Sequence, residues 1–209
     1  MLVIVNASED RREDWPEKKQ SGNIELVWVQ DADEFANYPE AEAFFDLRPK
    51  EENYRKYPVG KLVFINLVED RLESVPFGTA VRINGWPGFL NRNLVELVAR
   101  QEQLNMTRKI MDELGWQYKL LEDEPGMVAP RIVAMIINEA YFALGEGVSS
   151  REEIDIAMKL GTNYPYGPFE WSRKIGIRRI HDLLKKLAGF DDRYLIAPAL
   201  EEELKTLNE

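Results

Sequence analysis

The sequence contains no cysteine and only one histidine, His181, among its 209 residues. The absence of cysteine excludes disulfides, thiolate nucleophiles and cysteine-ligated metals. A single histidine excludes a histidine-rich metal site and leaves one imidazole as a candidate general base. The apolar and charged residues around His181 alternate as on an amphipathic helix, so we interpret it as a surface or boundary residue.

Long apolar runs are also missing from the sequence. No segment approaches the roughly 20 apolar residues that a membrane-spanning helix needs. The apolar residues 1–5 continue directly into a polar stretch and lack the basic start of a signal peptide. We therefore expect a cytoplasmic protein without a membrane partner.

Acidic residues exceed basic ones, 37 to 27, which gives a net charge of -10 and an isoelectric point of about 4.9. Such a surface repels phosphate backbones, so we expect no nucleic-acid partner. A local basic pocket could still bind an anionic cofactor against the overall field.

The first part of the chain has the pattern of an α/β domain. Strands are predicted over residues 2–5, 24–29, 43–47, 62–68, 80–84 and 116–121. Several of these runs are apolar without alternation, which suits a parallel sheet covered on both faces. Residues 94–114 are predicted to form one or two helices, so strands and helices alternate along this part of the chain.

After Asp123 the strand pattern stops and helical signals follow. Pro130 suits the first turn of a helix that ends near Gly145. Ser150 and Glu153 form a capping box that opens a second helix, and further helices are predicted over residues 169–174, 178–187 and 198–207. The sequence therefore predicts an α/β domain at residues 1–123 and an all-helical domain at residues 124–209.

Four motifs in a fixed order are the most specific feature of the sequence. They are Asp-Glu-Pro-Gly at 123–126, Asn-Glu-Ala at 138–140, Glu-Gly-Val at 146–148 followed by Glu-Ile-Asp at 153–155, and Tyr-Gly-Pro-Phe at 166–169. Each Pro–Gly pair alone is ordinary turn chemistry. Their joint order and spacing resemble the C-terminal domain of the 3-hydroxyacyl-CoA dehydrogenase family.

The resemblance implies a fold, a reaction and a set of partners. The implied fold is a reduced Rossmann-like parallel sheet followed by a helical domain like the C-terminal domain of 6-phosphogluconate dehydrogenase. The implied reaction oxidises the 3-hydroxyl of an acyl-CoA, such as 3-hydroxybutyryl-CoA, to a 3-keto group with NAD. The family also dimerises through its helical domain, so a homodimer is expected.

The resemblance also implies which residues would carry the reaction. The family uses a histidine, oriented by a glutamate, as the base that takes the hydroxyl proton. Glu96 matches the orienting glutamate, and the histidine position falls at Ile83 or Asn84. Neither side chain can accept that proton, so we expect Glu96 to be the remnant of a catalytic pair.

Three residues remain candidates for substrate binding. The amide of Asn84 could hydrogen-bond a substrate oxygen, and Arg82 could stabilise an anion. Asn66 stands in the segment that corresponds to the family's substrate-holding serines. A further substrate-holding asparagine of the family is replaced here by Pro130, which has no polar side-chain group.

The cofactor loop is altered as well. A dinucleotide fold needs a glycine-rich turn after its first strand, because glycine lets the backbone approach the diphosphate. Here residues 6–10 read Asn-Ala-Ser-Glu-Asp, with no glycine and two carboxylates. The segment before Ala43 is also too short for the family's first βαβ units. We therefore expect no cofactor, with NAD as the expectation if the chain is an active enzyme.

A basic patch on the helical domain leaves two explanations open. The family's aspartates in the segment after Gly-Pro-Phe correspond to Arg173 and Arg178, which lie beside Lys174 and Arg179. The patch either meets an anion such as a CoA phosphate or pairs with acidic neighbours.

Three functions follow from these observations. The main hypothesis is a catalytically impaired 3-hydroxyacyl-CoA dehydrogenase-like protein, a pseudoenzyme that binds acyl-CoA. The first alternative is an active NAD-dependent dehydrogenase with a rearranged base and cofactor loop. The second is a non-enzymatic dimeric interaction protein.

Overall fold

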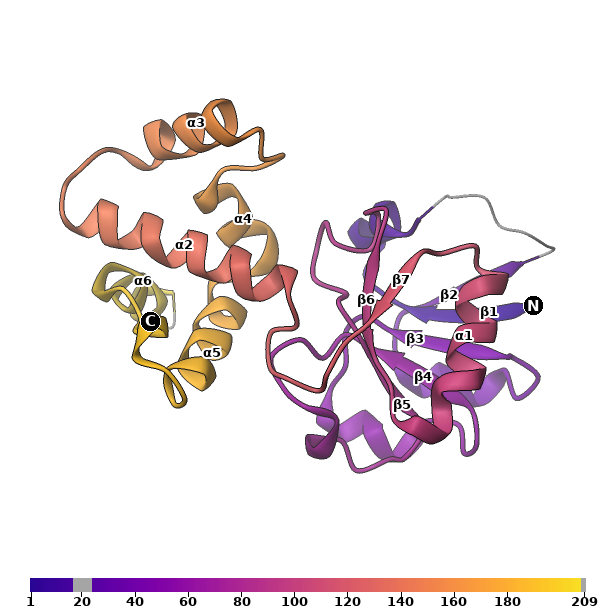
Figure 1. Cartoon of the computed structure of the whole chain (residues 1–209). Coiled ribbons are helices and arrows are strands. Elements are labelled where there is room, and N and C mark those ends of the chain that lie inside the picture. Colours follow the sequence, from indigo (N-terminus) through magenta and orange to yellow (C-terminus); the bar gives the residue numbers. More distant parts are fainter. Residues whose placement is uncertain (17–23, 208–209) are drawn as a thin grey trace. The chain divides into compact units, whose positions relative to one another are not determined.

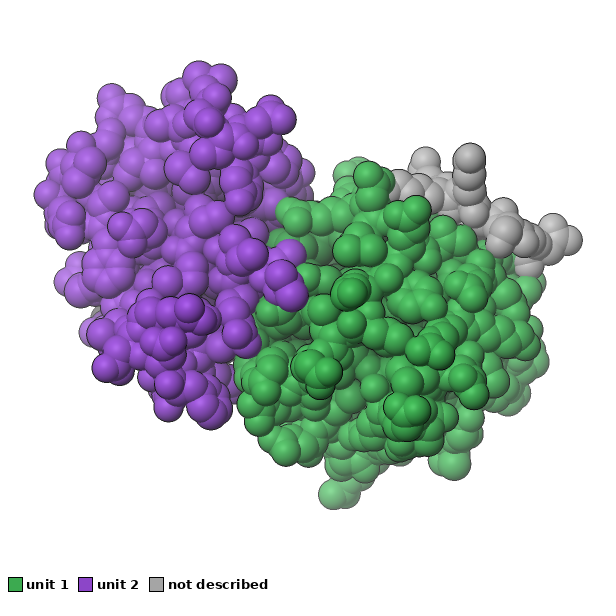
Figure 2. Space-filling model, in the orientation of Figure 1, with its two compact units in different colours: residues 1–127 green, residues 128–209 purple. Residues whose placement is uncertain are grey.

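The computed structural model describes residues 1–16 and 24–207. The chain divides into two compact units, Met1–Met127 and Val128–Glu209, which Figure 2 shows in green and purple. The boundary between the two units, judged by contacts between residues, falls after Met127. The boundary predicted from the sequence pattern falls after Asp123. Each unit has its own buried side chains.

The first unit is built on a seven-stranded sheet in the order β2-β1-β3-β4-β5-β6-β7 (Figure 1). Its strands are β1 (Leu2–Asn6), β2 (Glu25–Val29), β3 (Ala43–Asp46), β4 (Leu62–Ile65), β5 (Ala80–Ile83), β6 (Val95–Val98) and β7 (Tyr118–Leu120). Neighbouring strands are parallel except β5 and β6, which are antiparallel. The predicted α/β class is confirmed, with one antiparallel pair inside the sheet.

Short 3-10 helices make most of the connections in this unit. They are η1 (Glu9–Asp14), η2 (Ala32–Asn37), η3 (Glu51–Lys56), η4 (Leu72–Ser74) and η5 (Gln101–Gln103). Among the described residues of this unit, the one α-helix is α1 (Leu104–Glu113). Parallel strands are usually joined through α-helices, so the predicted reduction of the Rossmann-like fold lies in these shortened crossovers.

One predicted element is wrong. Residues 94–114 do not begin as a helix, because Val95–Val98 forms β6 between β5 and β7. The Val-Glu-Leu-Val run alternates between the two faces of the sheet, with Val95 and Leu97 in one core and Val98 in the other. A run of four residues is too short for its own periodicity to decide between helix and strand, and the two flanking strands decide it here.

Both faces of the sheet are covered, as the apolar strands predict. On one face, Trp15, Phe45 and Trp116 pack together with residues of α1, and the ring centroids of Trp15 and Trp116 lie 4.8 Å apart. On the other face, Phe35 packs against Phe44 at 5.0 Å between centroids. The strand ends are therefore held in fixed positions by two cores.

The second unit consists of helices (Figure 1). They are α2 (Ala129–Gly145), α3 (Arg151–Thr162), α4 (Pro168–Ile175), α5 (Ile177–Ala188), η6 (Asp192–Tyr194) and α6 (Pro198–Thr206). The helices predicted in this part of the chain are confirmed. Tyr141 of α2 meets Phe169 of α4 edge to face at 5.0 Å. Across residues 1–16 and 24–207, no helix has the length and apolar character to cross a membrane.

A buried carboxylate joins α3 to α4. Asp155 is the only residue of α3 that is buried, and its two oxygens accept hydrogen bonds from the backbone N–H groups of Phe169 (2.8 Å) and Glu170 (3.2 Å). These N–H groups have no partner inside their own helix, so Asp155 caps the start of α4 from another helix. Gly167 makes room for this contact, because a Cβ there would lie 2.2 Å from Asp155 Oδ1.

Candidate functional site

The ends of β5 and β6 bring Asn84 and Glu96 together. The antiparallel register places Ile83 opposite Leu97, so Asn84 lies opposite Glu96. The backbone N–H of Asn84 donates to the Glu96 carbonyl at 3.0 Å, and Asn84 Nδ2 donates to Glu96 Oε2 at 3.1 Å. Ile83 points instead into the core with Leu97. Of the two residues considered for the histidine position, Asn84 is the one that faces the glutamate.

The side chain of Asn84 has protein partners at both ends. Its Nδ2 donates to Glu96, and its Oδ1 accepts from the backbone N–H of Trp86 at 3.4 Å. Both Asn84 and Glu96 are buried, with 3% and 8% of their surface exposed. A carboxamide has no proton-accepting nitrogen, so the Asn84 side chain itself cannot serve as a general base. The substrate-binding role of Asn84 stays a prediction.

Arg82 lies on β5, two residues before Asn84, and is fully buried. Its Nε donates to the Leu67 carbonyl at 2.8 Å, Nη2 donates to the Val68 carbonyl at 3.2 Å, and Nη1 forms an ion pair with Asp123. Burial lowers the pKa of Arg82, and the contact with Asp123 opposes that change. The guanidinium thus connects the segment after β4 with the segment after β7 through hydrogen bonds and an ion pair. Its predicted role in substrate binding remains a proposal.

Asn66 is not joined to the Asn84–Glu96 pair by a hydrogen bond between described residues. Its Nδ2 donates to the Leu47 carbonyl at 3.1 Å, while its Oδ1 is buried without a hydrogen-bond partner among the described residues. Gly85 passes so close that a Cβ there would lie 2.9 Å from the Asn66 side chain. Of the four predicted site residues, Asn84 and Glu96 are in contact, Arg82 lies two residues before Asn84, and Asn66 binds the Leu47 carbonyl directly after β3.

A buried polar network at the ends of β1 and β3 was not predicted. Asp46 accepts hydrogen bonds from Asn6 Nδ2 (2.9 Å), from the Arg48 backbone N–H (2.9 Å) and from the Tyr57 hydroxyl. Burial raises the pKa of Asp46, and these hydrogen bonds oppose the rise only in part. Burial and the nearby Asp46 raise the pKa of Tyr57, so the tyrosine stays protonated as the donor.

Replacing Asp46 with asparagine is expected to stabilise the first unit or leave it unchanged at neutral pH. Because the pKa of Asp46 is raised in the folded state, its contribution to stability is complete below its ordinary value of 3.8 and is lost as the pH rises through the raised value. An asparagine stays neutral and keeps an oxygen for Asn6 and an amide for Tyr57. The measurement is urea unfolding of both proteins between about pH 4 and pH 8. A variant whose stability falls further below that of the natural protein as the pH rises would show that the charged carboxylate stabilises the fold.

The residues after β1 do not fit a dinucleotide diphosphate. The strand leads through Ser8 into η1, a six-residue 3-10 helix whose first turn carries Glu9 and Asp10. A hydrogen bond from Ser8 lowers the pKa of Asp10, so its carboxylate remains charged. The Asn6 side chain at the strand end is already bound to Asp46. A diphosphate here would meet carboxylates instead of the free N–H groups of a longer helix.

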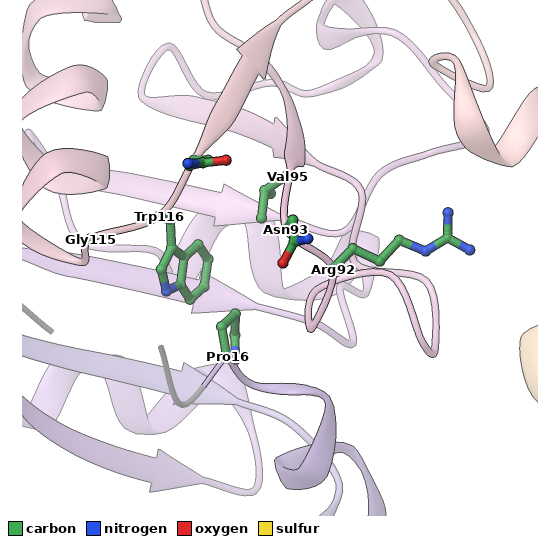
Figure 3. Close-up of a pocket in the computed structure, with 7 residues that line it drawn as sticks. Pro16, Arg92, Asn93, Val95, Gly115 and Trp116 are labelled. Carbon is green, nitrogen blue, oxygen red and sulfur yellow. The ribbon is translucent and has the colours of Figure 1, made fainter. Parts of the chain in front are cut away.

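A cavity of about 480 Å³ lies elsewhere in the first unit (Figure 3). It is lined by Pro16, Arg92, Asn93, Val95, Gly115, Trp116 and Gln117. In Figure 3, Asn93, Val95 and Trp116 surround the cavity and Arg92 points away from it. Arg92 lies over the Phe89 ring, 4.2 Å from its centroid. Val95 and Glu96 point to opposite faces of β6, so this cavity does not contain the Asn84–Glu96 pair.

The single histidine lies in the second unit. His181 lies on α5 with its Nδ1 3.2 Å from Asp182, its neighbour in sequence, as expected for a boundary residue on an amphipathic helix. Within the part of the chain that the structure describes, no group of three or more acidic or histidine side chains is placed to hold a metal ion.

Comparisons with known proteins give the following matches. Residues 126–207 match the family model for the C-terminal domain of 3-hydroxyacyl-CoA dehydrogenase. The chain is 51% identical over 84 residues to the 3-hydroxyadipyl-CoA dehydrogenase of Escherichia coli (strain K12), covering 39% of this chain and 18% of that protein. It is 31% identical over 153 residues to a probable 3-hydroxybutyryl-CoA dehydrogenase of Deinococcus radiodurans, covering 65% of this chain and 55% of that protein.

A solved structure shows the same fold. The (S)-3-hydroxybutyryl-CoA dehydrogenase of Ralstonia eutropha superimposes with a TM-score of 0.65 at 22% identity, over 87% of this chain and 70% of that one. The chain thus shares the fold of that structure, while it spans 18% and 55% of the length of the two relatives matched in sequence.

Proposed function

We propose that this chain, a divergent member of the 3-hydroxyacyl-CoA dehydrogenase family, binds acyl-CoA without catalysing the NAD-dependent oxidation of a 3-hydroxyl group. The observation that carries the proposal is the hydrogen-bonded Asn84–Glu96 pair. In that pair an amide occupies the place where the reaction requires a proton-accepting imidazole. Glu96 then holds an amide in position and is no longer a catalytic partner.

The altered cofactor loop supports the same proposal. Oxidation of the alcohol releases a hydride, and NAD would supply the acceptor when bound. The residues that would have to hold it are Ser8, Glu9 and Asp10, which place carboxylates at the start of a 3-10 helix. Two independent requirements of the reaction, the base and the cofactor loop, are therefore altered in one chain.

Retention of acyl-CoA binding is supported by the second unit. Residues 126–207, which include nearly all of this unit, match the C-terminal domain model of 3-hydroxyacyl-CoA dehydrogenase, whereas residues of the first unit depart from the pattern that the reaction requires. Arg82, Asn84 and Asn66 remain the candidates of the first unit for contact with such a ligand.

A titration with NADH and with acetoacetyl-CoA tests the proposal. We expect saturable binding of acetoacetyl-CoA by calorimetry, no saturable change in nicotinamide fluorescence, and no loss of nicotinamide absorbance when both are present. Turnover of NADH would establish the alternative of an active dehydrogenase. Failure of acetoacetyl-CoA to bind would favour the alternative of a non-enzymatic interaction protein.

The variant Asn84→His separates the missing base from the missing cofactor loop. The imidazole would lie opposite Glu96, and we expect the nearby carboxylate to raise its pKa above the ordinary value of about 6.5. The measurement is an NMR titration of this imidazole against that of His181, the single histidine of the natural chain. We expect the variant to remain inactive with NADH, because the loop after β1 is unchanged. Turnover by the variant would show that the cofactor site is intact.

A homodimer is the second part of the proposal, and the surface of α3 supports it. Ile156 and Leu160 of this helix are 52% and 83% exposed, and Val148 before it is 68% exposed. Exposed apolar side chains gathered on one segment are typical of an interface. Such a surface on one helix can pair with its own copy around a two-fold axis.

Light scattering coupled to size exclusion tests the dimer. We expect the mass of two chains for the natural protein and of one chain for Leu160→Glu, because a buried unpaired carboxylate opposes association. Leu207→Glu serves as the control, since Leu207 is a comparably exposed leucine (66%) outside α3. A natural protein that elutes as a monomer would contradict the proposal.

A further inference from the structure

A shallow cavity of about 550 Å³ on the second unit lies between the end of α3 and α4. Its lining residues are Lys159, Pro165, Tyr166, Glu170, Arg173 and Lys174. Three of these six are cations and one is an acid, although the chain as a whole has ten more acidic than basic residues. The local field in the cavity is therefore opposite in sign to that of the protein.

The acid in this cavity is already neutralised. Glu170 accepts a hydrogen bond from Lys159 Nζ at 2.6 Å and another from the Gly167 backbone N–H at 2.9 Å. These contacts lower the pKa of Glu170, with Lys159 as the larger cause. Lys159 and Glu170 thus form a closed pair, and the remaining charge of the cavity comes from Arg173 and Lys174.

Arg173 and Lys174 are weakly engaged by the protein. Arg173 lies 3.8 Å from Asp155, its side chain is 67% exposed, and the Asp155 oxygens already accept two backbone hydrogen bonds. Lys174 lies over the Tyr166 ring, 5.1 Å from its centroid, and has no carboxylate partner among the described residues. Cations in the last turn of a helix are favoured by its dipole, so their position alone assigns no ligand. The cavity and the Tyr166 ring beside these two cations are the features that indicate a ligand.

We propose that this cavity binds the phosphate monoester of a nucleotide, with Arg173 and Lys174 as the donors to the phosphate. Arginine offers a planar fork that matches phosphate oxygens, and lysine adds a point charge. Tyr166, fixed edge to face against Trp171 at 4.8 Å, supplies an aromatic wall beside the cations. If the proposed acyl-CoA binding is correct, on which this assignment of the source rests, the monoester is the 3′-phosphate of coenzyme A.

Calorimetry with four probes tests the site and separates the sources. The probes are adenosine 3′,5′-bisphosphate, CoA, dephospho-CoA, which lacks the monoester, and inorganic phosphate. We expect the bisphosphate to bind, and to bind more weakly as salt is added. We expect Arg173→Gln/Lys174→Gln to weaken it by roughly tenfold or more, because two charge-assisted contacts are lost. Dephospho-CoA should bind the natural protein more weakly than CoA does.

The control variant is Lys185→Gln/Lys205→Gln, which removes the same charge at two exposed lysines outside the cavity lining. It should bind the bisphosphate like the natural protein. Backbone NMR spectra add a second measurement. In the natural protein, the bisphosphate should shift the signals of Tyr166 and Lys174. Both variants should show the same helical pattern as the natural protein. Inorganic phosphate binding as tightly as the bisphosphate would identify a general anion site without a nucleotide and overturn the assignment.

The two proposals can fail separately. Equal bisphosphate affinity in the natural protein and in Arg173→Gln/Lys174→Gln overturns the cavity assignment, even if acetoacetyl-CoA binds. Bisphosphate binding that is lost in this variant, with no binding of acetoacetyl-CoA, keeps the cavity as a nucleotide site and removes the proposed acyl-CoA function.

Discussion

Replacement of Arg82 by methionine is expected to lower the free energy of unfolding of the first unit by roughly 2–4 kcal/mol, somewhat less than for a fully buried ion pair because the Asp123 side chain is 33% exposed. The guanidinium is fully buried and donates to the carbonyls of Leu67 and Val68 as well as to Asp123. Methionine preserves much of the volume and removes every donor. The Leu67 carbonyl loses its donor, whereas the Val68 carbonyl keeps the backbone N–H of Gly126. Asp123 keeps the backbone N–H of Leu72 and loses its cation.

Urea unfolding of the natural and variant proteins measures this effect. Lys56→Met is the matched control, because it removes a cation whose ion pair with Asp33 is about half exposed on both sides. Exposed pairs contribute only about 0–1 kcal/mol, so the control should unfold close to the natural protein. If the free energies of unfolding of Arg82→Met and the natural protein differ by less than about 1 kcal/mol, the structure around the substitution relaxes and water reaches the polar groups that lost their donor.

Gly167→Ala is expected to destabilise the second unit by roughly 2–4 kcal/mol. A Cβ at this position would lie 2.2 Å from Asp155 Oδ1 and 2.4 Å from Asp155 Cβ, so α3 or the start of α4 must move. Overpacking of this kind costs about 1–3 kcal/mol. Moving Asp155 also breaks its cap on the N–H groups of Phe169 and Glu170, and a lost cap adds about 1 kcal/mol.

Gly161→Ala provides a control of opposite sign within the same unit. Gly161 lies inside α3, and a Cβ there would meet no atom within 4 Å. Alanine in a helix is about 1 kcal/mol more favourable than glycine, so this variant should be more stable than the natural protein. Thermal unfolding followed by far-ultraviolet circular dichroism compares the two. Destabilisation of similar size in both variants would indicate a general intolerance of side chains in this region and not the contact with Asp155.

The sequence predicted most of the elements, because their signals are local. Apolar runs indicated the strands of the parallel sheet, and the capping box at Ser150 and Glu153 places the start of α3 where the structure has it. The failure at residues 94–114 has a physical cause. Whether Val-Glu-Leu-Val forms a strand depends on β5 and β7, which lie on either side of it in the sheet and outside any local sequence window.

The candidate site was predictable only as a set of residue types. Matching to a family pattern selected Glu96 and left Ile83 and Asn84 as alternatives. The choice between them requires the antiparallel register, which pairs Ile83 with Leu97. The Asp46–Tyr57–Asn6 network was missed because its members come from separate strands and connections, and no spacing along the chain marks their contact. The contact of Arg82 with Asp123 spans 41 residues and was missed for the same reason.

The tryptophans divide unequally between the two units, and this provides a spectroscopic label. Trp15 packs against both Trp28 and Trp116 on one face of the sheet, and Trp86 lies in the same unit, whereas Trp171 of α4 is the single tryptophan of the second unit. In a Trp171→Phe protein, all indole emission would come from the α/β unit. Subtracting that signal from the natural protein's emission leaves the helical unit alone, so the unfolding of each half can be followed in one cuvette without cutting the chain.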